Sequence, residues 1–312
     1  LSPDELFARP PREMLIDGLL GVGELAMLYS ESGAGKTFVV GDLSGSAITG
    51  GRFADEFDIP RPLTVCYAAG EGTGGLAERF KAVFSTHGIT PAQAGNMTVA
   101  LEVPQLFAPS GNGMAEFVRD YKVARGDNLD LLIVDTLHSA TYGSNENSAQ
   151  DAGAILKAVK YAQSQLSCAV LLVHHAGKGG NGERGSTAFR GAMDVIMEIV
   201  RLGGKSVLKC SKIKDGTPFT DIAFSLVAKE DSARVFWEGR IDASQGKSGK
   251  FKQEQIIEWL TDNPGKHTAN QIANGLGAKG TSIYELLEKL RRAGDIERHG
   301  SKIPYSFAMI QH

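Results

Sequence analysis

The segment Ser30-Glu-Ser-Gly-Ala-Gly-Lys36-Thr37 has the residue types and spacing of a phosphate-binding loop. Such a loop needs glycines so that backbone N–H groups converge on phosphate oxygens, a lysine for the β- and γ-phosphates, and a hydroxyl that holds Mg²⁺. The common pattern begins with glycine where this chain has Ser30, and an ordinary Gly-rich turn between a strand and a helix is the alternative. We predict that ATP and Mg²⁺ bind here, at the nucleotide-binding residues Glu31, Ser32, Gly33, Ala34, Gly35, Lys36 and Thr37.

Two carboxylates follow apolar runs and complete the chemistry of such a site. Asp135 ends the run Leu131–Val134, and a carboxylate at the end of a buried strand can hold Mg²⁺ together with Thr37. Glu71 follows residues 63–68 and can orient and deprotonate a water that attacks the γ-phosphate. The alternatives are an Asp that caps the next element and a solvated Glu in a Gly-rich turn. We therefore predict metal-binding roles for Asp135 and Thr37 and a catalytic role for Glu71.

A third polar position ends the apolar run of residues 169–173. His174 could contact the γ-phosphate there and report its loss to the next loop, and a buried, hydrogen-bonded histidine is the alternative. The loop Gly177–Gly191 contains six glycines. Its length is typical of a functional segment, and its cations suit the backbone of single-stranded nucleic acid. Ordering only against a neighbouring subunit is the alternative. The candidate contact residues are Lys178, Arg184 and Arg190.

The apolar pattern predicts the strands and helices that must position these residues. Continuous apolar runs are typical of strands covered on both faces, and their alternation with helical stretches predicts a doubly wound, mostly parallel α/β sheet. Later runs with short turns between them predict antiparallel strands at its edge. The expected parallel strands are residues 25–29, 63–68, 131–134 and 169–173, the helices are 36–48, 76–84 and 149–166, and the edge strands are 195–200, 206–210, 222–227 and 234–237.

The composition divides the chain into a large core and a small C-terminal unit. The core covers residues 1–243, of which 1–23 are Pro-rich and loop-like, and it ends at the small, polar linker 244–250. Residues 251–312 show three amphipathic helices and an alternating hairpin, an order typical of a winged-helix domain. Its cations favour duplex DNA as a partner, whereas glutamates on the third helix leave a replication protein as the alternative. The candidate contact residues are Lys279, Ser282, Lys289, Arg291, Arg292 and Lys302.

The overall composition limits the function classes. The chain has 312 residues, 42% of them hydrophobic, and a formal net charge of −3, which gives no global electrostatic footprint for nucleic acid. From Gln245 onward, ten Lys and Arg exceed seven Asp and Glu, so the tail could meet an anionic partner. Cys66, Cys168 and Cys210 lie in apolar runs and predict a reduced, cytoplasmic protein. We expect no signal peptide, membrane partner or metal cluster, and the missing initial Met indicates a fragment or a processed chain.

Several short motifs occur in an order that resembles a known family. They are Asp17-Gly-Leu-Leu, the phosphate loop, Ala69-Gly-Glu71-Gly, Val134-Asp135-Thr136-Leu, Glu146-Asn-Ser-Ala-Gln-Asp151, His174-His175-Ala-Gly-Lys178, Arg184-Gly-Ser-Thr-Ala-Phe-Arg190-Gly and Lys212-Ile-Lys-Asp215-Gly. Over about residues 12–240 the chain resembles the RepA-like branch of RecA-fold ATPases, typified by hexameric plasmid and phage replicative helicases.

The resemblance implies a role for several residues and a quaternary structure. It places Glu71 at the catalytic glutamate and His174 at the γ-phosphate sensor. It implies a basic finger from the adjacent subunit, for which Lys212 or Lys214 is the candidate and Lys209 a weaker one. The motifs offer no cis cation besides Lys36 for transition-state charge, and such a finger could supply it in trans. The implied protein is a homo-oligomer, most simply a hexamer, that acts on single-stranded DNA as a helicase or translocase. An ATP-gated, DNA-binding replication initiator or regulator is the alternative.

Overall fold

The structure is a computed structural model of the whole chain. It describes residues 2–8, 12–107, 111–145, 147–177, 186–202, 205–241, 253–276, 280–293, 295–299 and 306–309. The chain divides into two compact units, one made of Leu1–Val200 with Leu208–Gly239 and the other of Arg201–Val207 with Arg240–His312. The predicted linker 244–250 lies outside the described residues, as do Lys178, Arg184, Lys279 and Lys302.

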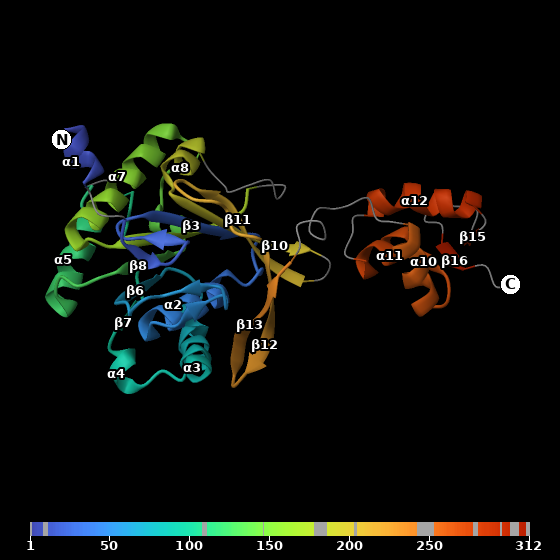
Figure 1. Cartoon of the computed structure of the whole chain (residues 1–312), viewed down its shortest axis with the longest axis horizontal. Helices are drawn as coiled ribbons and strands as arrows, with labels where there is room; N and C mark the ends of the chain where they lie inside the picture. Colours follow the sequence, from blue (N-terminus) through green and yellow to red (C-terminus); the bar gives the residue numbers. More distant parts are fainter. Residues whose placement is uncertain are drawn as a thin grey trace. The chain divides into compact units, whose positions relative to one another are not determined.

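A nine-stranded mixed sheet forms the centre of the described structure, with the strand order β13-β12-β11-β10-β3-β9-β8-β6-β7 (Figure 1). The strands from β10 to β7 in this order run parallel. Two residues separate β10 from β11 and β12 from β13, and such short connections join only antiparallel strands. The predicted fold class is thereby confirmed. The strands are β3 Leu25–Ser30, β6 Val65–Ala69, β7 Met97–Ala100, β8 Leu131–Asp135, β9 Ala169–His175, β10 Val195–Leu202, β11 Lys205–Ile213, β12 Ile222–Lys229 and β13 Ser232–Arg240.

Helices cover both faces of this sheet, which explains its continuous apolar strands. Helices α2 and α3 lie on one face and α5 and α7 on the other (Figure 1). Val39 and Leu43 belong to the core on the first face, whereas Val118 and Ile155 belong to the core on the second. The helices of this unit are α1 Pro3–Phe7, α2 Lys36–Thr49, α3 Leu76–His87, α4 Pro91–Ala94, α5 Gly113–Arg125, α6 Leu137–Ala140, α7 Ala149–Leu166 and α8 Thr187–Ala192, with a 3₁₀ turn η1 at Thr73–Gly75.

The structure adds elements that the apolar pattern did not predict. The expected loop-like N-terminal segment contains helix α1, whose start is fixed by a reciprocal capping box between Ser2 and Glu5. It also contains a hairpin of β1 Met14–Ile16 and β2 Leu20–Gly21. A second small hairpin pairs β4 Arg52–Phe53 with β5 Phe57–Asp58. Helix α5 was likewise not predicted, nor was strand β7, which is a short, half-exposed edge strand.

The C-terminal unit has its own small core. Its elements follow in the order helix, strand, helix, helix and two-stranded hairpin, and the strands pair in the order β14-β16-β15. The core residues include Ile256, Ile272, Leu287 and Phe307. The elements are α10 Gln253–Asp262, β14 His267–Thr268, α11 Ala269–Gly275, α12 Gly280–Ala293, β15 Ile296–His299 and β16 Ser306–Met309.

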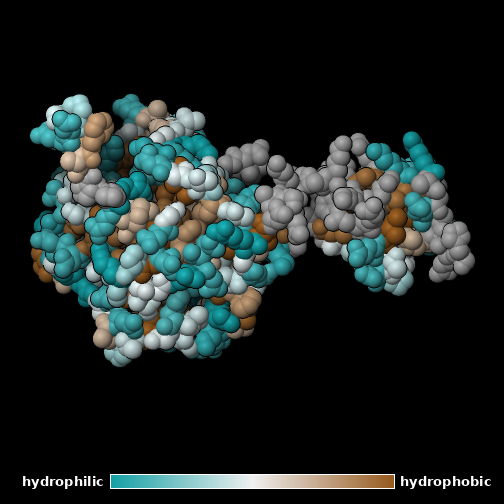
Figure 2. Space-filling view, viewed as in Figure 1, coloured by the Kyte–Doolittle hydropathy of each residue, from teal (hydrophilic) through white to brown (hydrophobic). Residues whose placement is uncertain are grey.

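The visible surface is mostly polar (Figure 2) and the cysteines are unpaired. Figure 2 shows a visible face covered largely by polar residues, with apolar ones scattered among them. The three cysteines are unpaired, and burial raises the pKa of the Cys66 and Cys168 thiols to about 12. None of the helices among the described residues has the length and apolar character that crossing a membrane requires.

Candidate functional site

The predicted phosphate loop lies between the end of β3 and the start of α2. Gly33 and Gly35 have φ angles of 75° and 96°, in the left-handed region that glycine adopts most readily. The ammonium of Lys36 donates to the backbone oxygen of Ser30 at 3.2 Å, to its hydroxyl at 3.0 Å and to the backbone oxygen of Glu31 at 3.1 Å. The serine that departs from the common pattern is therefore a hydrogen-bond partner of the lysine. Burial lowers the pKa of Lys36, while the charges of Asp135 and Glu71 oppose this shift.

Asp135 reaches the same place from β8. Its carboxylate oxygen Oδ2 accepts a hydrogen bond from the hydroxyl of Thr37 at 3.4 Å and a second from the hydroxyl of Tyr67. Burial raises the pKa of Asp135, partly offset by these hydrogen bonds and by the charge of Lys36. Mg²⁺ prefers oxygen ligands and is usually held by one or two carboxylates plus phosphates. The hydroxyl of Thr37 and the carboxylate of Asp135 are a donor set that fits this ion.

Glu71 lies one strand away, just past the end of β6. Its oxygen Oε1 accepts from the hydroxyls of Thr136 at 2.9 Å and Ser139 at 3.0 Å. Its other oxygen lies 3.9 Å from Nε2 of His175. Burial acts to raise the pKa of Glu71, but the two hydroxyls and the nearby imidazoles of His175 and His138 outweigh it and hold that pKa below its usual value. The carboxylate is thus ionised at neutral pH, as a group that accepts a proton must be.

The two consecutive histidines at the end of β9 differ in burial and in whether they line the cavity beside the phosphate loop. Side chains alternate between the faces of a strand, so only one of them can face the phosphate loop. His175 pairs in register with Ser30 and lines the cavity beside the loop. His174, the residue predicted to contact the γ-phosphate, is fully buried and does not line that cavity. The structure therefore brings His175, not His174, to the other predicted site residues.

These side chains enclose one cavity of about 250 Å³ at the carboxyl edge of the sheet. Glu31 and Ala34 of the predicted loop do not line it. Arg79 lines it although sequence reasoning overlooked this residue, and its guanidinium donates to the backbone oxygen of Gly72 at 3.1 Å. Arg79 lies in the first turn of α3, the helix that directly follows the Glu71 turn, and this closeness in the sequence is the signal that could have identified it. The lining residues are Ser32, Gly33, Gly35, Lys36, Thr37, Phe38, Glu71, Gly72, Arg79, Asp135, Thr136, His175 and Leu226.

The predicted finger lysines lie on β11 and just after it, outside this cavity. The ammonium of Lys212 donates to the backbone oxygens of Arg190, Gly191 and Met193 at 2.8, 3.3 and 2.6 Å. It thereby satisfies carbonyls at the end of α8, where cations are favoured. Lys214 has a 60% exposed side chain and lies 3.4 Å from Asp194. Of the predicted loop cations, Arg190 is described and donates to the backbone oxygen of Ser211 at 3.4 Å.

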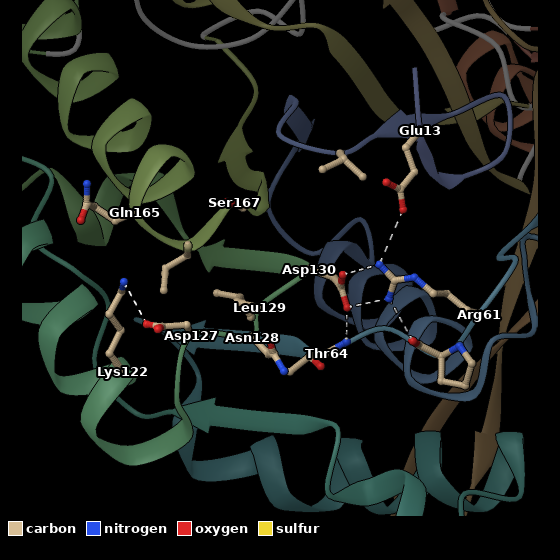
Figure 3. Close-up of a pocket in the computed structure, with 13 residues that line it drawn as sticks. Glu13, Arg61, Thr64, Lys122, Asp127, Asn128, Leu129, Asp130, Gln165 and Ser167 are labelled. Carbon is tan, nitrogen blue, oxygen red and sulfur yellow. Dashed lines mark hydrogen bonds and ion pairs between the residues drawn. The ribbon is translucent and has the colours of Figure 1, made fainter. Parts of the chain in front are cut away.

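A second, larger hollow of about 650 Å³ lies at the amino edge of the sheet (Figure 3). Its charged side chains pair with one another. Arg61 contacts Asp130 through two hydrogen bonds of 3.0 and 2.7 Å, and Lys122 lies 2.9 Å from Asp127. No residue of the predicted site lines this hollow.

The fold and the site together are those of a P-loop nucleotide-binding domain on a mostly parallel sheet. A family model described as an AAA domain matches residues 3–181, more than half of the chain, so the chain belongs to this AAA domain family. The structure is similar to a crystal structure of the RadB recombinase, at 18% identity and a TM-score of 0.45, with 66% of this chain and 88% of that chain covered. It is also similar to a KaiC-like protein from the hyperthermophilic archaeon Pyrococcus horikoshii OT3, at 15% identity and a TM-score of 0.47, with 71% and 93% covered. A search of curated proteins finds no match.

Proposed function

We propose that the protein is an ATP-hydrolysing, hexameric DNA helicase or translocase of the plasmid or phage replication type. The observation that supports hydrolysis is the convergence of Lys36, Thr37, Asp135 and Glu71 on one cavity. These residues come from three different elements. They supply the ammonium, hydroxyl and carboxylate groups that phosphoryl transfer to water requires. The resemblance of the ordered motifs to replicative helicases supports the finer assignment.

Each residue has a chemical task in this proposal. Lys36 binds the β- and γ-phosphates, while Thr37 and Asp135 hold Mg²⁺, which when bound neutralises phosphate charge. Glu71 accepts a proton from the attacking water through the oxygen that faces His175. His175 takes the γ-phosphate contact first expected of His174, because it lines the cavity.

Arg79 changes the expected charge balance of the site. The sequence motifs offered no cis cation besides Lys36, but the guanidinium of Arg79 lies in the cavity lining of the same subunit. It can therefore stabilise negative charge that develops during hydrolysis. A finger in trans remains part of the hexamer proposal. Lys214 suits that role better than Lys212, whose ammonium is occupied by three backbone oxygens.

Single-stranded DNA is the proposed substrate of the core, through Lys178, Arg184 and Arg190. The C-terminal unit is proposed to be a winged helix that binds duplex DNA or a replication protein. On α12, Glu288 lies 3.0 Å from Arg291 and 3.3 Å from Arg298, which offsets part of the positive charge. Lys289 and Arg292 are exposed and are the better candidates for phosphate contacts.

The test combines hydrolysis, unwinding and assembly measurements on the full chain. Glu71→Gln should bind ATP normally and turn over less than about 1% as fast, because the amide cannot accept a proton. Wild-type hydrolysis should rise with single-stranded DNA, and light scattering with ATP should show six subunits. Unchanged turnover in Glu71→Gln would remove that residue from the mechanism. Hydrolysis without unwinding, translocation or DNA stimulation would make the ATP-gated regulator the better function.

A further inference from the structure

The turn that follows β8 is hydrogen-bonded to the segment that ends at Glu71. The backbone N–H of Gly70 donates to the backbone oxygen of Asp135 at 2.6 Å. Directly after Asp135, Thr136 caps the short helix α6 by accepting from the backbone N–H of Ser139 at 3.4 Å. The segment that ends at Glu71 and the turn that contains Ser139 are therefore fixed to each other by the backbone.

Gly70 allows this approach because it has no side chain. A Cβ atom at this position would lie 2.6 Å from Cβ of Ser139 and 3.0 Å from Cγ1 of Val103, closer than unbonded carbon atoms approach. The missing side chain brings the hydroxyl of Ser139 within 3.0 Å of Oε1 of Glu71. The hydrogen bond between Ser139 and Glu71 thus depends on two features, the glycine that precedes Glu71 and the turn that carries Ser139.

The two hydroxyls act on one oxygen of the carboxylate. Thr136 and Ser139 both donate to Oε1, at 2.9 and 3.0 Å, and their own hydroxyl oxygens lie 3.2 Å apart. Oε2 is the oxygen on the side of His175, at 3.9 Å. Holding Oε1 therefore fixes the rotamer of Glu71 and leaves Oε2 to accept a hydrogen bond from water.

We propose that Ser139 is a positioning residue that orients Glu71 for activation of the attacking water. This inference rests on the proposed ATP hydrolysis. Ser139 does not line the nucleotide cavity, so it acts through Glu71 and not on the nucleotide. The helix cap does not need its hydroxyl, because the cap uses the backbone N–H of Ser139 and the side chain of Thr136. The hydroxyl of Ser139 is therefore available to donate to the carboxylate of Glu71.

The test is Ser139→Ala in the 312-residue chain. Loss of one of two orienting hydrogen bonds should lower kcat about 10-fold, in line with the cost of misplacing a catalytic group. The KM for ATP and the affinity for a non-hydrolysable ATP analogue should stay within about two-fold of wild type, since the nucleotide contacts are intact. Ser164→Ala is the matched control, because that hydroxyl donates to a backbone oxygen on the surface of α7, and its kcat should not change.

A double-mutant cycle separates positioning from general damage. In a Glu71→Gln background, Ser139→Ala should cause no further loss of the residual turnover, because its effect passes through the carboxylate. Gly70→Ala should reproduce the loss of kcat by displacing Ser139, and it covers the case in which Ser139→Ala folds poorly. Unchanged kcat in Ser139→Ala, or an equal loss in the Glu71→Gln background, would overturn the inference. Absence of hydrolysis in the wild type would instead refute the proposed function.

Discussion

The two edges of the central sheet each carry a hollow, and the contrast between them shows what identifies a site. The hollow at the amino edge is the larger, about 650 Å³ against about 250 Å³ at the carboxyl edge. At the amino edge the cations and carboxylates form ion pairs with one another, as in Arg61–Asp130 and Lys122–Asp127. At the carboxyl edge, hydroxyls, carboxylates and cations from separate elements line one small space. Convergence of complementary groups, and not volume, distinguishes the candidate site.

The direction of the chain explains why the two edges differ. Parallel strands deliver their carboxyl ends to the same edge, and the helix that follows β3 begins there with backbone N–H groups that attract anions. At the opposite edge, loops lead into the strands and are held in place by local side-chain hydrogen bonds. Asp130 forms such bonds, since it accepts from the backbone N–H of Thr64 at 2.8 Å as well as from Arg61.

The largest expected effect is that of Lys36→Ala at the carboxyl edge. Removing the ammonium should weaken ATP binding at least about 100-fold, because it deletes the charge-assisted contact to two phosphates. Titration with a fluorescent ATP analogue measures this directly. Lys122→Ala is the matched lysine variant at the amino edge and should bind ATP like the wild type. Equal losses in both variants would break the contrast between the edges.

The consecutive histidines test the same contrast within one strand. His175→Ala should lower kcat between about 10-fold and 100-fold with little change in melting temperature, because its side chain is partly exposed in the cavity. His174→Ala should instead lower the free energy of unfolding by about 1–3 kcal/mol, because it empties a fully buried position. Steady-state kinetics and thermal unfolding of both variants distinguish the two. The reverse pattern would restore His174 as the phosphate contact.

Tyr67→Phe should have a smaller effect, which is to raise the Mg²⁺ concentration that ATP binding requires. The hydroxyl of Tyr67 donates to Asp135, while the ring contacts Phe80 edge to face at 5.2 Å, so phenylalanine keeps the packing and removes one hydrogen bond. The Mg²⁺ concentration for half-maximal binding of ATP should rise about three-fold to ten-fold, equivalent to one modest hydrogen bond.

Nucleotide affinity measured without Mg²⁺ distinguishes this effect from structural damage and should not change. Tyr121→Phe is the control, since that hydroxyl donates to a backbone oxygen on the other face of the sheet at 3.0 Å. A lower affinity for metal-free ATP in Tyr67→Phe would show that the hydroxyl supports the fold and not the carboxylate.

The sequence predicted the parts of the site that depend on local chain continuity. The phosphate loop and Asp135 follow directly from apolar runs, and the structure brings both to one cavity with Glu71. The sequence could not distinguish His175, which lines the cavity, from the buried His174, and the reason is physical. A strand buried on both faces has no polar alternation, so its apolar run does not reveal which of two terminal residues faces the loop.

The remaining site residues depend on tertiary contacts. Arg79 and Leu226 enter the cavity from α3 and β12, and Ser139 reaches Glu71 only because Gly70 leaves room for it. None of these contacts follows from spacing within a single element. The same reason explains why short edge elements such as β7 were missed, since their pairing depends on a neighbouring strand.

The smallest expected effects are those of variants in the larger hollow. Arg61→Ala should lower the free energy of unfolding by only about 0.5 kcal/mol, because the arginine is half exposed and its ion pair is screened by water. Asp130→Ala should cost more, about 1–2 kcal/mol, because it also leaves the backbone N–H of Thr64 without its acceptor. Neither variant should change kcat or the KM for ATP, since no residue of the nucleotide cavity is involved. Chemical denaturation measures the stability difference, and a loss of hydrolysis in a fully folded Arg61→Ala protein would show that the amino edge also takes part in function.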